Sequence, residues 1–272
     1  MSARAGKRSA LRRRWMKKDL VYDEKNQLAL DVYEPEQIEA AILLIHGGGW
    51  FRGDKQKEKQ LAERLADDHF LVVSPNYRLA PDFLYPAALI DVFAAYGWLQ
   101  AADYPLPAGK IAALGSSAGG NLAIELALQK GIPAASWSGI IDLADWVAHH
   151  EALAAAMNQK PDFDQQDPAK IDQSGLNDAF YKWFVLNYVG QNQKLLQEAD
   201  PLQRVSPAAG PIFMANSLKE LVPLSGVFKL QAALTKNEVP SETRILAGTV
   251  HGEGYTELVY QNTVNFLRDS FL

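Results

Sequence analysis

The sequence predicts an α/β fold in which a mostly parallel central sheet is covered by helices on both faces. Short, continuously apolar runs such as Ile42–Ile45 and Phe70–Ser74 have the character of strands buried on both faces. They alternate with segments whose apolar residues recur at helical spacing, such as Ala87–Ala102. Alternation of this kind implies right-handed crossovers and a parallel sheet. The 272 residues, 48% of them hydrophobic, suffice for one large domain of this type.

The elements can be placed in chain order. Strands are predicted at 20–22, 28–33, 42–45, 70–74, 110–114, 134–139, 211–215 and 243–246. Helices are predicted at 55–69, 87–102, 121–129, 178–188 and 223–235, followed by a closing amphipathic helix through Tyr260, Val264, Leu267 and Phe271. The first two strands read as a hairpin. The helix at 55–69 carries a single apolar stripe made by Leu61, Ala62 and Leu65.

A small-residue turn joins the strand at 110–114 to the helix at 121–129. Residues 115–119 read Gly-Ser-Ser-Ala-Gly, which fits the G-x-S-x-G pattern in its required context of strand, tight turn and helix. Such a turn would lift the Ser117 hydroxyl clear of the backbone at the positive end of the helix. A glycine-rich turn without chemistry would give the same five residues.

A second glycine-rich loop follows the strand at 42–45 and reads His46-Gly47-Gly48-Gly49-Trp50. Three successive glycines allow bare backbone N–H groups to converge on one point, which is how an oxyanion hole is built. We expect His46 to brace this loop rather than to bind a metal, because no second ligand stands at metal spacing from it.

Together these motifs make the chain similar to the α/β-hydrolase superfamily, and within it to HGGG-type, hormone-sensitive-lipase-like esterases and lipases. The similarity extends from about Leu20 to the C-terminus and rests on 46–50, on Asn76-Tyr77-Arg78-Leu79-Ala80-Pro81, on 115–123 and on His251-Gly252. The resemblance implies an α/β-hydrolase fold with Ser117 as nucleophile and His251 as base. It also implies that the backbone N–H groups of Gly48, Gly49 and Ala118 form the oxyanion hole.

The position of His251 supports its role as base. A neutral serine hydroxyl is a poor nucleophile and needs a base within hydrogen-bond reach. Of the five histidines, only His251 lies just after a late strand, in the chain order expected for this fold. We expect His251–Tyr255 to be a flexible loop. His149 and His150 are interpreted as solvated helix residues.

The acid of the triad departs from the family pattern. The family usually has an Asp in a D-x-x-V-P-like turn after the penultimate strand, and Lys219 stands at that position. A cation cannot orient the histidine. Glu220 is the nearest carboxylate and is the expected acid if the loop shifts by one residue. A chain without a normal acid remains the alternative, and Glu253 is a weaker candidate because it leaves the same loop as the histidine.

The alternation of strand and helix patterns is interrupted from about residue 142 to residue 200. So long a structureless loop is improbable, so an inserted cap over the active site is expected there. Its aromatic residues are expected mainly to pack the insertion and, as a group, to wall an apolar substrate pocket: Trp146, Phe163, Phe180, Tyr181, Trp183, Phe184 and Tyr188.

Composition excludes several classes of protein. The chain has no cysteine, which rules out disulfides and zinc–thiolate sites and suits a cytoplasmic enzyme. Residues 1–15 carry six basic and no acidic residues, so the rest is more acidic than the net charge of −5. We therefore expect no nucleic-acid or membrane partner. Residues 1–18 are expected to be a disordered basic extension to a hydrolase domain at 19–272, and Met16 could itself be a natural start.

Three hypotheses about function remain open. The first is a serine carboxylesterase that hydrolyses short-chain acyl or small aromatic esters through an acyl-enzyme intermediate. The second is an amide hydrolase, because formamidases of the superfamily also carry an HGG-x-W loop like His46–Trp50. The third is a non-catalytic binding protein on the same scaffold. The favoured mechanism needs no cofactor and no metal, its partner is a small-molecule ester, and a homodimer stays open.

Overall fold

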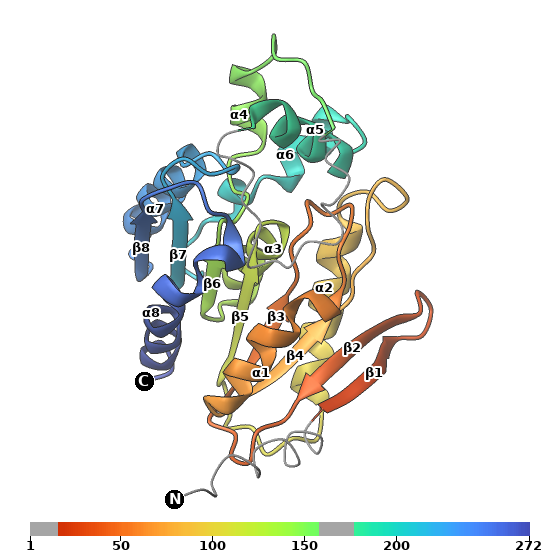
Figure 1. Cartoon of the computed structure of the whole chain (residues 1–272), viewed down its shortest axis with the longest axis vertical. Coiled ribbons are helices and arrows are strands. Elements are labelled where there is room, and N and C mark those ends of the chain that lie inside the picture. The colour runs from red at the N-terminus through yellow and green to blue at the C-terminus, as the bar shows by residue number, and fades with distance from the viewer. Residues whose placement is uncertain (1–15, 158–176) are drawn as a thin grey trace, which may run out of the picture.

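The computed structural model describes residues 16–157 and 177–272. In these ranges eight strands form one sheet in the order β1-β2-β4-β3-β5-β6-β7-β8 (Figure 1). β1 pairs with β2 and β2 with β4 in antiparallel fashion, and every other pair of neighbours is parallel. The strands are β1 (Met16–Asp23), β2 (Leu28–Tyr33), β3 (Ala40–Ile45), β4 (Phe70–Pro75), β5 (Ile111–Ser116), β6 (Ala134–Trp137), β7 (Ile212–Ser217) and β8 (Ser241–Leu246). The predicted hairpin and mostly parallel sheet are confirmed.

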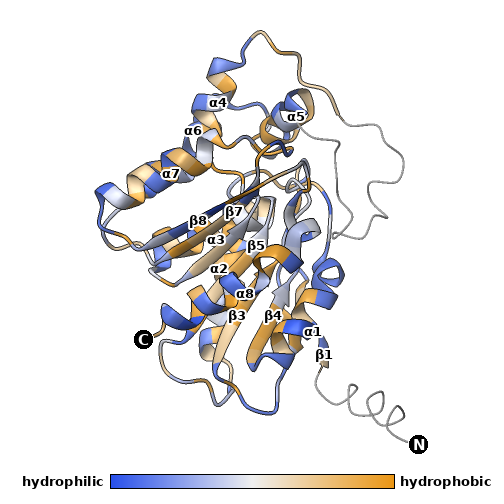
Figure 2. Cartoon of the chain, turned by 60° about the vertical axis from the view of Figure 1, so that its left-hand side comes forward, coloured by the Kyte–Doolittle hydropathy of each residue, from blue (hydrophilic) through white to orange (hydrophobic). Residues whose placement is uncertain are grey.

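Helices cover both faces of the sheet, as predicted. They are α1 (Lys59–Asp67), α2 (Ala87–Ala101), α3 (Ala118–Lys130), α4 (Ala144–His149), α5 (Asp178–Tyr188), α6 (Gln193–Ala199), α7 (Ser225–Lys236) and α8 (Thr256–Asp269), with short 3₁₀ turns η2 (Lys55–Glu58), η4 (Pro201–Arg204) and η5 (Gly252–Tyr255). Buried side chains of α2, α3 and α7 join one hydrophobic cluster, and those of α1 and α8 join a second cluster. Figure 2 shows the central strands as a largely hydrophobic layer between these helices.

The alternation of side chains along β3 explains its unbroken apolar sequence. Ala41, Leu43 and Ile45 belong to the cluster under α2 and α3, whereas Ala40, Ile42 and Leu44 belong to the cluster under α1 and α8. Successive residues of a strand point to opposite faces, so a strand covered on both faces must be apolar at every position. All six residues of β3 are buried.

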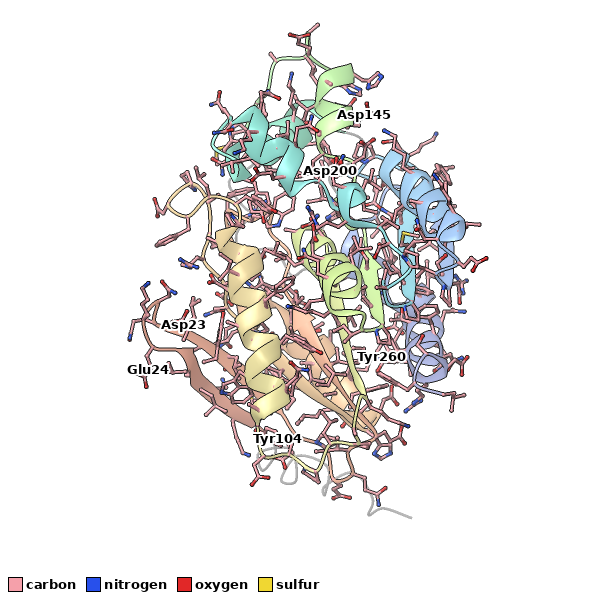
Figure 3. The ribbon with its side chains drawn as sticks, turned by 180° about the vertical axis from the view of Figure 1, so that it is seen from behind. Asp23, Glu24, Tyr104, Asp145, Asp200 and Tyr260 are labelled. Carbon is pink, nitrogen blue, oxygen red and sulfur yellow. The ribbon has the colours of Figure 1, made fainter. Side chains whose placement is uncertain are left out.

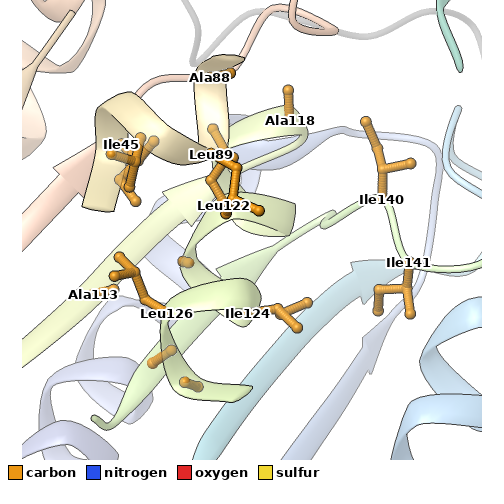
Figure 4. Close-up of a cluster of buried hydrophobic side chains, with 14 of the residues drawn as sticks. Ile45, Ala88, Leu89, Ala113, Ala118, Leu122, Ile124, Leu126, Ile140 and Ile141 are labelled. Carbon is orange, nitrogen blue, oxygen red and sulfur yellow. The ribbon is translucent and has the colours of Figure 1, made fainter. Parts of the chain in front are cut away.

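Helix α3 is the most enclosed helix of the site region. Eleven of its thirteen residues are buried. Figure 4 shows Leu122 and Leu126 of α3 among Ile45 of β3, Ala113 of β5 and Leu89 of α2. A helix that is buried on nearly every side does not need a polar face. The two polar side chains within 118–128 are paired, since Asn121 Nδ2 donates to the Ile140 carbonyl and Glu125 accepts from Arg204. The enclosed helix holds its N-terminus rigidly at the end of β5.

The predicted helix at 55–69 is divided into η2 and α1. Two side chains of η2 point into the protein: Lys55 contacts Asp31, with 2.5 Å between Nζ and Oδ1, and Glu58 contacts Glu253. Side chains three residues apart lie on the same side of a 3₁₀ turn. Lys55 and Glu58 therefore face inward together, and both are buried.

The segment between β6 and β7 contains α4, α5, α6 and η4 and lies beyond one end of the sheet (Figure 1). Asp200 (labelled in Figure 3) ties its two ends together, because its carboxylate accepts hydrogen bonds from the backbone N–H groups of Leu143 and Ala144 at 3.2 and 3.0 Å. α5 has the predicted boundaries, while α4 and α6 were not predicted. Phe163 lies outside the described residues.

The predicted N-terminal extension at 1–18 overlaps the first strand. β1 begins at Met16, so the expected domain boundary at residue 18 falls inside a strand, and residues 1–15 lie outside the described part of the chain. Within the described residues no helix combines the length and the apolar character needed to cross a membrane.

Candidate active site

The residues singled out in the sequence follow four of the five adjacent parallel strands β3-β5-β6-β7-β8 at their carboxyl ends. The glycine loop follows β3, Ser117 follows β5, Glu220 follows β7, and His251 follows β8. Carboxyl ends of parallel strands meet at one edge of a sheet, where α/β proteins bind their ligands. Ser117, His251, Gly48 and Gly49 line one common cavity of about 60 Å³. Phe180 and Phe184 of α5 and Leu221 supply its apolar wall.

Ser117 occupies a strained position between β5 and α3. Its backbone has φ 53° and ψ −120°, which a residue with a side chain rarely adopts. The turn is anchored to the neighbouring strand β6, since the Ser117 N–H donates to the Trp137 carbonyl at 2.8 Å. A Cβ atom on Gly119 would lie 2.0 Å from the Ile45 carbonyl oxygen, and one on Gly115 would lie 2.3 Å from the Gly119 carbonyl oxygen. Both glycines of the motif are therefore required by backbone contacts.

The glycine loop folds back directly over the serine turn. Gly48 (φ 120°) and Gly49 (φ 58°) take positive φ angles, and the Gly48 carbonyl accepts hydrogen bonds from the N–H groups of Phe51 and Arg52. A Cβ on Gly47 would lie 3.4 Å from Cβ of Ser117. Ala118, the third expected oxyanion donor, is the first residue of α3 and is fully buried. The glycine loop thus lies beside Ser117, with Gly48 and Gly49 lining the cavity that Ser117 also lines and Ala118 adjacent to Ser117 in the chain.

His46 braces this loop, as expected. Its Nδ1–H donates to the Gly47 carbonyl at 2.8 Å, and its ring stacks on Tyr77 with 4.1 Å between centroids. The Tyr77 hydroxyl donates to the His46 carbonyl at 2.9 Å. Burial lowers the pKa of His46 to about 4, so the ring stays neutral at neutral pH.

Glu220, and not Lys219, points at His251. The distance from Glu220 Oε2 to His251 Nδ1 is 2.6 Å, and both side chains are buried. A carboxylate only accepts, so Nδ1 carries the proton and Nε2 is left to accept one. The second carboxylate oxygen, Oε1, accepts from the Ser217 N–H at 2.7 Å. This bond holds Glu220 inward, whereas Lys219 donates its N–H to the Gly248 carbonyl beyond the end of β8 and is exposed.

The segment after His251 is ordered into η5 and is buried, so the expectation of a flexible loop was wrong. The Gly252 N–H donates to Ser138 Oγ (2.8 Å), and the Tyr255 hydroxyl donates to the Ala215 carbonyl (2.7 Å). The hydroxyl oxygens of Ser138 and Tyr255 are 2.7 Å apart. Because the Tyr255 proton is already donated to Ala215, the Ser138 hydroxyl is the donor in this bond. This directed chain of hydrogen bonds anchors the histidine segment to β6 and β7.

The remaining candidates lie elsewhere. Glu253 turns away from the histidine and accepts from the Ser116 hydroxyl. His149 is exposed, and His150 stacks on Trp146 with 3.9 Å between ring centroids.

Glu58 lines the cavity and was not singled out in the sequence. A signal for it exists, because Glu58 stands three and seven residues before Leu61 and Leu65, on the apolar stripe of the helix. A charged residue on a buried stripe calls for a partner.

Comparison with known proteins places the chain in a family. A family model described as the alpha/beta hydrolase fold matches residues 42–254. The chain belongs to the α/β-hydrolase family. The fold and the resemblance seen in the sequence are thereby confirmed.

Individual relatives of this α/β hydrolase match over shorter spans. A carboxylesterase of Mycobacterium tuberculosis is 31% identical over 173 residues, 60% of this chain and 51% of the relative. Arylacetamide deacetylase of Bos taurus is 35% identical over 118 residues, 38% of this chain and 29% of the relative. The match thus spans about half the length of these curated relatives or less. Among solved structures, an esterase of Pyrobaculum calidifontis superimposes with a TM-score of 0.74 over 94% of this chain and 86% of its own, at 23% identity.

The contact between α3 and β3 can be tested by substitution of glycine. Gly119→Ala should destabilise the protein by about 3 kcal/mol, because the new methyl group meets the rigid Ile45 carbonyl. Gly97→Ala is the matched control, since Gly97 is exposed within α2 and a Cβ there meets nothing within 4 Å. It should stabilise the protein by about 1 kcal/mol through helix propensity. Urea unfolding measures both, and equal stabilities would contradict the tight approach.

Proposed function

We propose that this chain is a serine carboxylesterase that hydrolyses short-chain acyl or small aromatic esters through an acyl-enzyme intermediate. The proposal rests on one observation above all: Ser117, on its strained turn, faces the same cavity as a histidine whose Nδ1 contacts a buried carboxylate. This is the donor and acceptor order that a Ser-His-acid hydrolase needs.

In the acylation step, His251 Nε2 takes the proton of the Ser117 hydroxyl as its oxygen attacks the ester carbonyl. The Glu220 carboxylate stabilises the imidazolium that forms. The alkoxide oxygen of the tetrahedral intermediate accepts hydrogen bonds from the N–H groups of Gly48, Gly49 and Ala118. His251 then gives its proton to the leaving alcohol, and the C–O bond breaks.

In the deacylation step, His251 takes a proton from water, and the resulting hydroxide attacks the acyl carbonyl on Ser117. The same three N–H groups hold the second tetrahedral intermediate. Collapse of that intermediate returns the proton to Ser117 and releases the carboxylic acid. No further group is needed, since each proton taken by His251 is given back within the same half-reaction.

The segment 142–200 serves in this proposal as a cap that limits substrate size. Phe180 and Phe184 of α5 reach the cavity and pack edge to face, with 5.3 Å between ring centroids. Trp146, Tyr181 and Tyr188 are buried and pack within the protein instead. Tyr188 stacks on Trp50 of the glycine loop at 4.1 Å, so the cap is rigidly joined to the site. A small, rigid apolar cavity suits short acyl groups.

Amide hydrolysis is the second candidate. It is favoured by the match to a relative named arylacetamide deacetylase and by the HGG-x-W loop. The same acyl-enzyme chemistry would apply, with an amine as the leaving group. Relative rates on p-nitrophenyl butyrate and on an N-formyl anilide distinguish the two reactions.

The proposal as a whole is tested with a fluorophosphonate probe. The wild-type protein should be labelled at one site per chain, and Ser117→Ala should lose both labelling and ester turnover while it keeps its melting temperature. His251→Ala should be equally inactive, and the double variant scarcely worse, because members of a catalytic unit fail together. A wild-type protein that neither reacts with the probe nor hydrolyses any ester would be a binding protein.

The acid assignment gives a separate prediction. Glu220→Gln keeps the shape but loses the charge that stabilises the imidazolium, so kcat should fall at least about a hundredfold with KM little changed. Lys219→Ala is the control from the adjacent, exposed position and should leave kcat and KM unchanged. A Glu220→Gln variant with unchanged kcat and KM, together with a gain of activity in Lys219→Asp, would show that the protein lacks a normal acid.

Acyl-chain length gives a further prediction. On p-nitrophenyl esters, kcat/KM should peak at about two to six acyl carbons, because each methylene contributes about 0.8 kcal/mol only while the cavity has room. Phe184→Leu enlarges the wall and should move the optimum to longer chains. Phe213→Leu, the same change at a buried site away from the cavity, should not. An optimum at about twelve carbons with activation at an oil–water interface would point to a lipase.

A further inference from the structure

Two buried carboxyl side chains line the cavity but have no part in the reaction proposed above. Glu58 comes from η2 and is 2% exposed, and Glu253 comes from η5 and is 9% exposed. They lie 195 positions apart in the chain, yet their side chains hydrogen-bond to each other. Carboxylates only accept hydrogen bonds, so this contact requires a proton between them.

Each carboxyl group also binds a residue next to the proposed machinery. The Gly47 N–H donates to Glu58, and Gly47 opens the glycine loop that contains Gly48 and Gly49. The Ser116 hydroxyl donates to Glu253 Oε1, and Ser116 directly precedes Ser117. The pair therefore connects the glycine loop, the serine turn and the histidine segment.

Ser116 is packed tightly between two glycines of these segments. A Cβ on Gly47 would lie 3.0 Å from the Ser116 carbonyl oxygen, and one on Gly252 would lie 3.3 Å from Ser116 Cβ. With so little free space, a change in the position of Gly47 or Gly252 must be transmitted to Ser116 and then to Ser117. The hydrogen-bonded pair closes this layer on the side facing the cavity.

We infer that Glu58 and Glu253, sharing one proton, are positioning residues that hold the glycine loop and the histidine segment in register with Ser117. This inference rests on the proposed esterase function. It assigns the pair no contact with reacting atoms. Its effect is exerted through the Gly47 peptide and the Ser116 hydroxyl.

Loss of the shared proton would place two negative charges in contact inside the protein, which drives the segments apart. Burial, followed by the charge of Glu253, raises the pKa of Glu58 well above its ordinary value of 4.5. The other charged or titratable groups around the pair are Arg52, Lys57, His46, Tyr77, His251, Glu220 and Tyr255. Because all of these remain unchanged in a Glu58 variant, comparison of variants isolates the pair.

Glu58→Gln and Glu58→Ala form the central comparison. The amide of Gln can donate to Glu253 and accept from Gly47 without a titrating proton, whereas Ala can do neither. Glu58→Ala should lose about a hundredfold in kcat with KM little changed, because the oxyanion donors act mainly in the transition state. Glu58→Gln should recover most of that loss. Glu24→Gln, at the exposed turn of the β1–β2 hairpin (Figure 3), is the matched control.

The pH profile provides the readout that a merely structural role would not move. Wild-type kcat should decline on the alkaline side as the shared proton is lost, and Glu58→Gln should lack this decline.

The pH dependence of folding stability gives an independent measure. The folded state holds the proton that the unfolded chain has lost, so the contribution of Glu58 to stability is full below pH 4.5 and declines as pH rises. The wild-type melting temperature, measured relative to Glu58→Gln, should therefore fall with rising pH.

The outcomes separate the two proposals. An active wild type with an unimpaired Glu58→Ala, or with the same alkaline decline in Glu58→Gln, overturns the positioning role and leaves the esterase proposal intact. A wild type inactive on every ester and unreactive with fluorophosphonate overturns the esterase proposal and, with it, the positioning role. The melting comparison still decides whether the pair shares a proton, and a pH-independent difference would show that it does not.

Discussion

The close approach of α3 to the end of β3 is the contact on which the candidate site depends. Gly119 lies so near the Ile45 carbonyl that no side chain fits between them, and this places Ser117 at a left-handed turn directly beside the glycine loop. The backbone of the turn is strained, and the strain is sustained because α3 is enclosed on nearly every side. A looser helix would let the turn relax and would separate the serine from the loop.

The same packing logic extends through the sheet. Central strands such as β3 are apolar at every position because α2, α3 and α7 cover one face and α1 and α8 cover the other. Polar groups are concentrated where the strands end. There they are paired: His46 with the Gly47 carbonyl, Glu220 with His251 and Ser217, and Ser138 with Gly252 and Tyr255. Buried polar groups of this kind are costly unless satisfied, so each pairing fixes the geometry of its segment.

The parts of this structure that repeat a local pattern could be predicted from the sequence. The strands, the serine turn and the glycine loop each carry their own signal in a few consecutive residues, and they were found. Long-range contacts carry no such signal. Lys55 and Glu58 of η2 meet partners far away in the chain, and η5 is bonded to Ser138, which follows β6. The inward turn of Glu220 is likewise accompanied by a long-range contact, that of the Lys219 N–H with the Gly248 carbonyl beyond the end of β8, which the sequence left open.

The position of Glu220 has a consequence for how such sites are recognised in a sequence. A glutamate is one methylene longer than an aspartate, and here it reaches Nδ1 from one position later, while the backbone before it stays paired with β8. The place of a carboxylate is thus set by the length of its side chain and the course of its backbone together, and not by its alignment column alone. Lysine at position 219 is then no sign that His251 lacks a carboxylate partner.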